Sequence, residues 1–78
     1  MSEDESENVR TIVAYNFNTQ SHVLKKLSND SCVEVRNYVA CNPNTSDEVI
    51  KILCNDKDAR VNKTAKEEFT RRIHLKMK

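Results

Sequence analysis

Residues 12–27 read IVAYNFNTQSHVLKKL, and residues 38–53 read YVACNPNTSDEVIKIL. These stretches belong to a longer match, in which residues 9–30 align without a gap on residues 35–56. Twelve of the 22 aligned positions are identical. A fixed period in the range of about 20–50 residues is typical of stacked repeats, in which each unit leaves a face for its neighbour. The sequence therefore predicts a solenoid built from 26-residue units.

Each unit is predicted to contain two short helices separated by a break. In the second unit, Ser31 and Glu34 form a capping-box pattern before the first helix, and Thr45 and Glu48 form one before the second. The run CNPNT ends the first helix, because a proline disfavours helical geometry at the residue before it. The first unit follows the same plan around a break at NFNT. Six apolar positions are expected to be buried equivalents in the two units: Val13, Val39, Val23, Val49, Leu27 and Leu53.

A third unit begins at Val61 and then departs from the repeat. The run KEEFTR contains no helix breaker where the second unit has ACNPNT. An i, i+4 apolar stripe predicts instead one long helix that covers the end of the stack: Val61, Ala65, Phe69, Ile73 and Met77. The expected fold class is all-α, a single domain over residues 8–78 with about two and a half helical-repeat units. The units are residues 9–34, residues 35–60 and a partial unit with the C-terminal capping helix, residues 61–78.

Composition restricts the class of protein. The 78 residues include no Gly, one Pro and no Trp, which favours helices and disfavours Gly-rich phosphate-binding loops. Residues 1–7 carry four acids and no base, so we expect an acidic, disordered tail there. The chain starts at Met1 and ends in an unmatched helix, as we expect for a complete small protein.

The sequence shows no signal for a membrane or for secretion. No apolar run approaches the roughly 18 residues that a membrane span needs, and no basic start precedes an apolar run. Three cysteines are an odd number and include no Cys-x-x-Cys pair, which favours a reduced, cytoplasmic protein.

The stretch VRNYVACNPNTSDEVIKILCNDKDARV resembles the leucine-rich repeat variant family. Its units run approximately Val-Arg-x-x-Val-Ala-x-Asn-Pro-x-Thr-Pro-x-x-x-Leu-x-x-Leu-x-x-Asp. The resemblance covers residues 9–61 and is looser in the first unit, where Phe17 replaces the proline. It implies paired short helices, often one α and one 3₁₀, in a right-handed superhelix related to HEAT and armadillo repeats. It also implies a scaffold with no defined activity. Some members carry a cysteine-rich iron–sulfur segment, which nothing here matches, so no cofactor is expected.

Recurring polar residues are expected to support the fold. Four asparagines stand at the helix breaks, where amide side chains bond to local backbone, with a ligand role as the alternative: Asn16, Asn18, Asn42 and Asn44. Arg10 and Arg36 recur with the unit, and Arg36 is expected to pair with a loop acid such as Asp30.

A catalytic or metal site is not expected. His22 and His74 lie far apart in the chain, and no Ser or Cys stands in a nucleophile motif. The spacings of 9 and 13 residues between the cysteines match no common zinc site. The cysteines fit better as small core residues. We therefore expect the protein not to be an enzyme.

Positions at which the two units differ are candidates for contact with a partner, because a scaffold needs only the matched positions. Tyr and Phe are also residues that anchor interfaces. The candidate partner-binding residues are Tyr15, Phe17, His22 and Tyr38. The alternative is that Tyr15 and Phe17 cover the open N-terminal end of the stack. The expected function is a small, non-catalytic protein–protein interaction module, an adaptor or inhibitor that binds a larger protein of unknown identity.

A basic C-terminal segment suggests nucleic acid as the alternative partner. Residues 57–78 carry eight bases against three acids. The candidate patch consists of Lys63, Lys66, Arg71 and Arg72. Glu67 and Glu68 interrupt it, and a solvated helix face explains the same charges. We expect a monomer rather than a homodimer paired through its N-terminal ends, because two acidic tails would meet there and repel.

Overall fold

The computed structural model describes residues 6–76, and these form α-helices and no strand. The helices are α1 (Glu7–Tyr15), α2 (Ser21–Leu27), α3 (Val33–Cys41), α4 (Asp47–Leu53) and α5 (Ala59–Lys76). The all-α prediction is confirmed, and both helices of each 26-residue stretch are α-helical rather than 3₁₀. None of the helices in this part of the chain is both long enough and apolar enough to cross a membrane.

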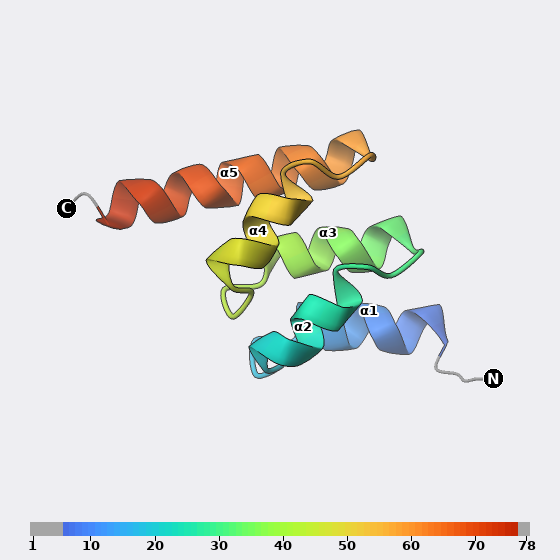
Figure 1. Cartoon of the computed structure of the whole chain (residues 1–78). Helices are drawn as coiled ribbons and strands as arrows, with labels where there is room; N and C mark the ends of the chain where they lie inside the picture. The colour runs from blue at the N-terminus through green and yellow to red at the C-terminus, as the bar shows by residue number, and fades with distance from the viewer. Residues whose placement is uncertain (1–5, 77–78) are drawn as a thin grey trace.

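The central element is α3, which packs against α1 on one side and α5 on the other. Figure 1 shows these three helices side by side, with α2 and α4 crossing them in a second layer. The molecule is elongated, with extents of 45 × 26 × 16 Å. The buried core runs through both layers and contains Ala14, Leu24, Val35, Val39, Ala40, Val49, Leu53, Val61 and Ala65.

The first helix of each 26-residue stretch ends at the same place. Helix α1 ends at Tyr15 and α3 at Cys41, and each is followed by an extended asparagine, Asn16 or Asn42. The break after α3 was predicted from Pro43, but α1 breaks identically without a proline. The asparagine and the loop that follows it are therefore sufficient to end the helix.

The predicted capping boxes are wrong by one residue. The residue before α3 is Cys32 rather than Ser31, and its side chain makes no cap bond. Ser46 rather than Thr45 caps α4, with its hydroxyl oxygen accepting from the backbone N–H of Val49 at 3.3 Å. The threonine hydroxyls point instead to the preceding helix.

The two aligned threonines tie each loop to the helix before it. The Thr19 hydroxyl donates to the Val13 carbonyl, and the Thr45 hydroxyl donates to the Val39 carbonyl, both at 2.6 Å. Each of these carbonyls also accepts from the backbone N–H of the asparagine that ends its helix, so the threonine hydroxyl adds a second bond there. This role explains why Thr recurs in both units.

The six apolar equivalents are fully buried only in the second unit. Val39, Val49 and Leu53 are inaccessible to solvent, whereas Val13, Val23 and Leu27 are half-buried. The first unit packs against a neighbour on one side only, so its equivalents remain partly open.

The long C-terminal helix is present as predicted, but its apolar stripe is buried only at its start. Val61 and Ala65 are fully buried, and Phe69 is half-buried with the Lys51 ammonium 5.8 Å from its ring centroid. Ile73 is exposed, and Met77 lies outside the described residues.

Of the predicted acidic tail, residues 1–5 lie outside the described residues. The other two lie at the start of α1, with Ser6 as its N-cap. Glu7 is its first residue, and the Ser6 hydroxyl oxygen accepts from the backbone N–H of Val9 at 3.3 Å. A serine cap and an acid in the first turn both stabilise a helix N-terminus.

Candidate interaction surface at the N-terminal end

An arginine and an aspartate 20 residues later form an ion pair in each unit. Arg10 Nε lies 2.7 Å from Asp30 Oδ2, and Arg36 Nε lies 2.8 Å from Asp56 Oδ2. The prediction that Arg36 pairs with a loop acid is confirmed, but the acid is Asp56 rather than the Asp30 given as the example, because Arg10 occupies the Asp30 carboxylate. Arg36 does reach Asp30, but through the backbone carbonyl, to which its Nη1 donates at 2.8 Å.

These ion pairs hold the loops between units. Burial raises the pKa of Asp56, but hydrogen bonds from Arg36 and from the Asp58 backbone N–H outweigh burial and hold that pKa below its ordinary value. The hydrogen bond to Asp56 in turn raises the pKa of Arg36. Both side chains are buried, so this pair acts within the fold and offers no charge to a ligand.

Asn16 and Asn42 bond to the backbone of their own loops as predicted, through oxygens that accept from the backbone N–H groups of Asn18 and Asn44. Asn42 and Asn44 bond to the backbone of the first unit as well, whereas the Asn18 side chain makes no hydrogen bond within residues 6–76. The Asn42 amide nitrogen donates to two carbonyls of the first unit, each at 2.9 Å, and the Asn44 amide nitrogen donates to two more. The four acceptors are the carbonyl oxygens of Ala14, Asn16, Phe17 and Thr19. These bonds join the second unit to the first.

Arg72 supplies the corresponding bonds at the other end. Its Nη1 donates to the Thr45 carbonyl at 2.7 Å, and its Nη2 lies 3.3 Å from the Asn42 carbonyl and 3.5 Å from that of Pro43. The loop of the second unit is thereby bonded by α5, as the loop of the first unit is bonded by Asn42 and Asn44. Sequence reasoning missed this role, because Arg72 lies outside the repeated pattern.

The predicted basic patch is divided by ion pairs. Arg72 bonds to Glu68 and to Asp47, each at 2.8 Å, and Arg71 bonds to Glu68 as well. Lys63 and Lys66 are exposed, and neither makes an ion pair with another residue between positions 6 and 76. Two of the four predicted positive charges, those of Arg71 and Arg72, are therefore paired with acids of the chain itself.

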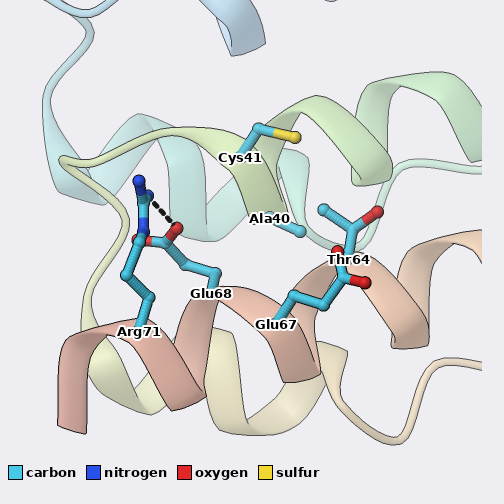
Figure 2. A pocket seen from close by; sticks show the side chains of 6 residues that line it. All are labelled: Ala40, Cys41, Thr64, Glu67, Glu68 and Arg71. Carbon is cyan, nitrogen blue, oxygen red and sulfur yellow. Dashed lines mark hydrogen bonds and ion pairs between the residues drawn. The ribbon is translucent and has the colours of Figure 1, made fainter. Parts of the chain in front are cut away.

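A hollow of about 320 Å³ lies between α3 and α5. Figure 2 shows Cys41 on one side of it and the Arg71–Glu68 pair on the other. Burial raises the pKa of the Cys41 thiol, and the charge of Glu68 raises it further. A thiol with a raised pKa stays protonated at neutral pH, which is opposite to the need of a nucleophile or a metal ligand.

The described residues contain no cluster of three or more His, Cys, Asp or Glu side chains that is placed to hold a metal ion.

The surface with the most uncovered apolar side chains lies at the N-terminal end. We define the N-terminal face as Val9, Ile12, Tyr15, Asn16 and Phe17. Its apolar members are between 42% and 64% exposed. The Tyr15 ring lies 6.1 Å from that of Phe17, and a shallow hollow of about 370 Å³ opens among the last four residues of the face.

The N-terminal face matches a surface that is covered in the second unit. Val9 is 42% exposed, whereas its equivalent in α3, Val35, is fully buried. Asn16 is exposed, whereas Asn42 is 1% exposed because it reaches into the first unit. The side of α3 that packs on α1 is therefore equivalent, in the repeat alignment, to the outer side of α1. No residue in the described part of the chain covers that outer side.

The structure brings together three of the four residues predicted to bind a partner. The Tyr15 ring meets the Tyr38 ring edge-on at 5.4 Å and lies beside Phe17. His22 lies elsewhere, on α2, at the edge of a separate hollow of about 560 Å³ that Arg10 also lines. The sequence did not single out Asn16 as a surface residue. The available signal was its alignment with Asn42, once Asn42 is known to bond to the neighbouring unit.

No protein-family model, no curated protein and no solved structure matches this chain. The assignment of a function therefore depends on the geometry of the chain itself.

Proposed function

We propose that this chain is a small, non-catalytic protein–protein interaction module that binds a larger protein through its N-terminal face. The observation that carries the proposal is the difference between the two ends. At one end, α5 packs on α3 and α4. At the other, Ile12 and Phe17 are each 64% exposed beside Tyr15. Contiguous apolar and aromatic side chains of this kind mark interaction sites, and aromatic residues dominate binding energy there.

The scaffold is a right-handed helical-repeat solenoid of the leucine-rich repeat variant kind, in which α5 acts as the cap. Three contacts that recur with the 26-residue unit support this architecture. They are the Arg–Asp pairs, the threonine hydroxyl bonds and the bonds that the Asn16 and Asn42 carboxamide oxygens accept from the backbone two residues later. A stack that is capped at one end and open at the other suits an adaptor or inhibitor, and the odd number of cysteines favours the cytoplasm as its location.

Nucleic acid binding by α5 is the less favoured function. Arg71 and Arg72 are engaged by Glu68, although Arg71 is itself 65% exposed, and Lys63 and Lys66 are the bases of the patch that make no ion pair within residues 6–76. Proteins that bind nucleic acid usually present a larger continuous basic face. Catalysis is also disfavoured, since the thiol in the hollow between α3 and α5 has a raised pKa.

Capture of partners from the source cell tests the proposal. The immobilised full chain is compared with Phe17→Glu and with a matched control, Ile52→Glu, which alters an exposed apolar residue on α4. Bound proteins are identified by mass spectrometry, and thermal melts verify that each variant folds. We expect a specific protein to be lost from Phe17→Glu and retained by Ile52→Glu. Equal retention by both variants would contradict a role for the N-terminal face.

The second part of the test measures the binding of DNA and RNA oligonucleotides to the full chain. At a salt concentration of about 0.15 M we expect no complex in the sub-micromolar range, because few phosphate contacts are available to release counterions. A sub-micromolar complex that Lys63→Glu and Lys66→Glu weaken would overturn the protein-binding proposal.

A further inference from the structure

We infer that the N-terminal face recognises the end of an α-helix together with the loop that follows it, on a protein other than this chain, through unpaired backbone carbonyls of that loop. This inference rests on the proposed function and names the kind of partner that the face fits.

The second unit shows how such a face is occupied. Val35 and Tyr38 lie three residues apart on one side of α3, and Asn42 directly follows the helix. The Tyr38 ring meets Tyr15, and the Asn42 amide donates to carbonyls at the end of α1. This side of α3 therefore binds a helix end and its loop.

The first unit presents the same set of positions without an occupant. Val9, Ile12 and Asn16 are the equivalents, and all three are exposed. The Asn16 carboxamide oxygen accepts from the Asn18 backbone N–H at 2.8 Å, just as the Asn42 oxygen accepts from Asn44 at 2.9 Å. This bond fixes the orientation of the amide. The Asn16 amide nitrogen therefore faces outward, and no acceptor for it lies within residues 6–76.

Within residues 6–76, the loops that follow α1 and α3 in a second copy of this chain do not offer the required carbonyls. The loop after α1 has its carbonyls at residues 14, 16, 17 and 19 bonded by Asn42 and Asn44. The loop after α3 has its carbonyls at residues 42, 43 and 45 bonded by Arg72. The carbonyls of both loops are thus already bonded within the molecule. The occupant is a different helical protein, whose terminal helix has an apolar side and ends in a loop with free carbonyls.

An extended chain tests this recognition without knowledge of the natural partner. A second copy of residues 9–34 is placed before Val9 of the full chain, so that its helix and loop lie on the original face. Asn16→Asp in the original unit keeps the oxygen that accepts from Asn18 and removes the outward donor. We expect this change to lower the melting temperature by about 5 °C or more in the extended chain and by under about 2 °C in the natural chain.

Asn29→Asp is the matched control, because Asn29 is an exposed asparagine of the same unit. We expect it to have the same small effect in both chains. Equal effects of Asn16→Asp in the two chains would overturn the inference. Sedimentation of the natural chain tests whether a second copy of the chain occupies the N-terminal face instead. We expect a 9.0 kDa species, and a dimer of about 18 kDa that Phe17→Glu splits would assign the face to a second copy instead.

The captured partner separates this inference from the proposed function. Asn16→Asp is expected to weaken a complex that Phe17→Glu abolishes, by roughly tenfold. If Phe17→Glu abolishes the complex and Asn16→Asp leaves its affinity unchanged, the docking function stands and carbonyl recognition is wrong. If no protein is captured while the extended chain behaves as expected, the function fails and the recognition chemistry stands.

Discussion

At the scale of single residues, Arg72 joins three parts of the molecule. Its guanidinium bonds to Glu68 within α5, to Asp47 at the start of α4 and to the Thr45 carbonyl in the loop between α3 and α4. Burial lowers the pKa of Arg72, but the hydrogen bonds to Glu68 and Asp47 outweigh burial, so its pKa is raised and its charge is kept.

Arg72→Ala should therefore destabilise the protein strongly, whereas Arg71→Ala should not. The Arg72 side chain is 15% exposed and its removal leaves loop carbonyls without a donor, at a cost of roughly 2–4 kcal/mol. Arg71 pairs with the same Glu68 but is 65% exposed, and solvent screens such pairs. The free energy of unfolding of both variants is measured by urea denaturation. Similar stability losses from the two neighbours would contradict the role of Arg72 in bonding the loop between α3 and α4.

A pH dependence follows from Asp56. Its pKa is lower in the folded chain than the roughly 3.9 of an unfolded aspartate, so the folded state holds fewer protons in that range. The resulting stabilisation is fully present above about pH 4 and is lost as the pH falls through the folded-state pKa.

We expect Asp56→Asn to reduce the slope of melting temperature against pH below about pH 4, in addition to lowering stability at neutral pH. Glu48→Gln serves as the control, since Glu48 is exposed and makes no ion pair with a described residue. The melting temperatures of both variants are measured by thermal melts across this pH range. An unchanged slope in Asp56→Asn would show that its ion pair with Arg36 does not govern the acid response.

At the scale of elements, the internal repeat was sufficient to predict the helices and the break between them. Aligned positions have aligned roles, as Thr19 and Thr45 show by bonding the carbonyls of Val13 and Val39. The cap of α4 was misplaced by one residue because Thr45, Ser46 and Asp47 are adjacent and more than one of them fits the capping pattern. Before α3, Ser31 fits the pattern but the helix begins one residue later, after Cys32.

Contacts across units were beyond the reach of the sequence. Asn42 bonds to residue 14 and Arg72 to residue 45, which are pairs 28 and 27 residues apart. Such pairs depend on how the helices pack, whereas the sequence pattern reports which positions recur. The sequence predicted that Arg36 pairs with a loop acid but did not select Asp56 over Asp30, since both were available in the loops.

The packing of α4 gives a direct test of the helix register. Leu53 is 1% exposed and its neighbour Ile52 is 56% exposed. Leu53→Ala should cost roughly 2–5 kcal/mol, a large part of the stability of a domain this small, because it leaves a cavity in the core. Ile52→Ala should cost under about 1 kcal/mol. Denaturant midpoints measure both, and comparable losses would place α4 in the wrong register.

At the scale of the whole molecule, the two ends of the row α1, α3 and α5 differ. Helix α5 is twice as long as α3 and lies along it (Figure 1). Helix α1 instead exposes Val9, Ile12 and Tyr15 to solvent. The central claim is that this outer side of α1 is the same surface that α3 uses to bind α1. Equivalent residues on the two helices should then differ in energetic role although they match in sequence.

Val35→Ala and Val9→Ala test this claim most directly, because the two valines are aligned in the repeat and both lie in helices. Val35 is fully buried and Val9 is 42% exposed. The free energy of unfolding, measured by urea denaturation, should fall by roughly 2 kcal/mol for Val35→Ala and by under about 1 kcal/mol for Val9→Ala. Equal losses would mean that Val9 is already covered, and that the N-terminal end is not an open face.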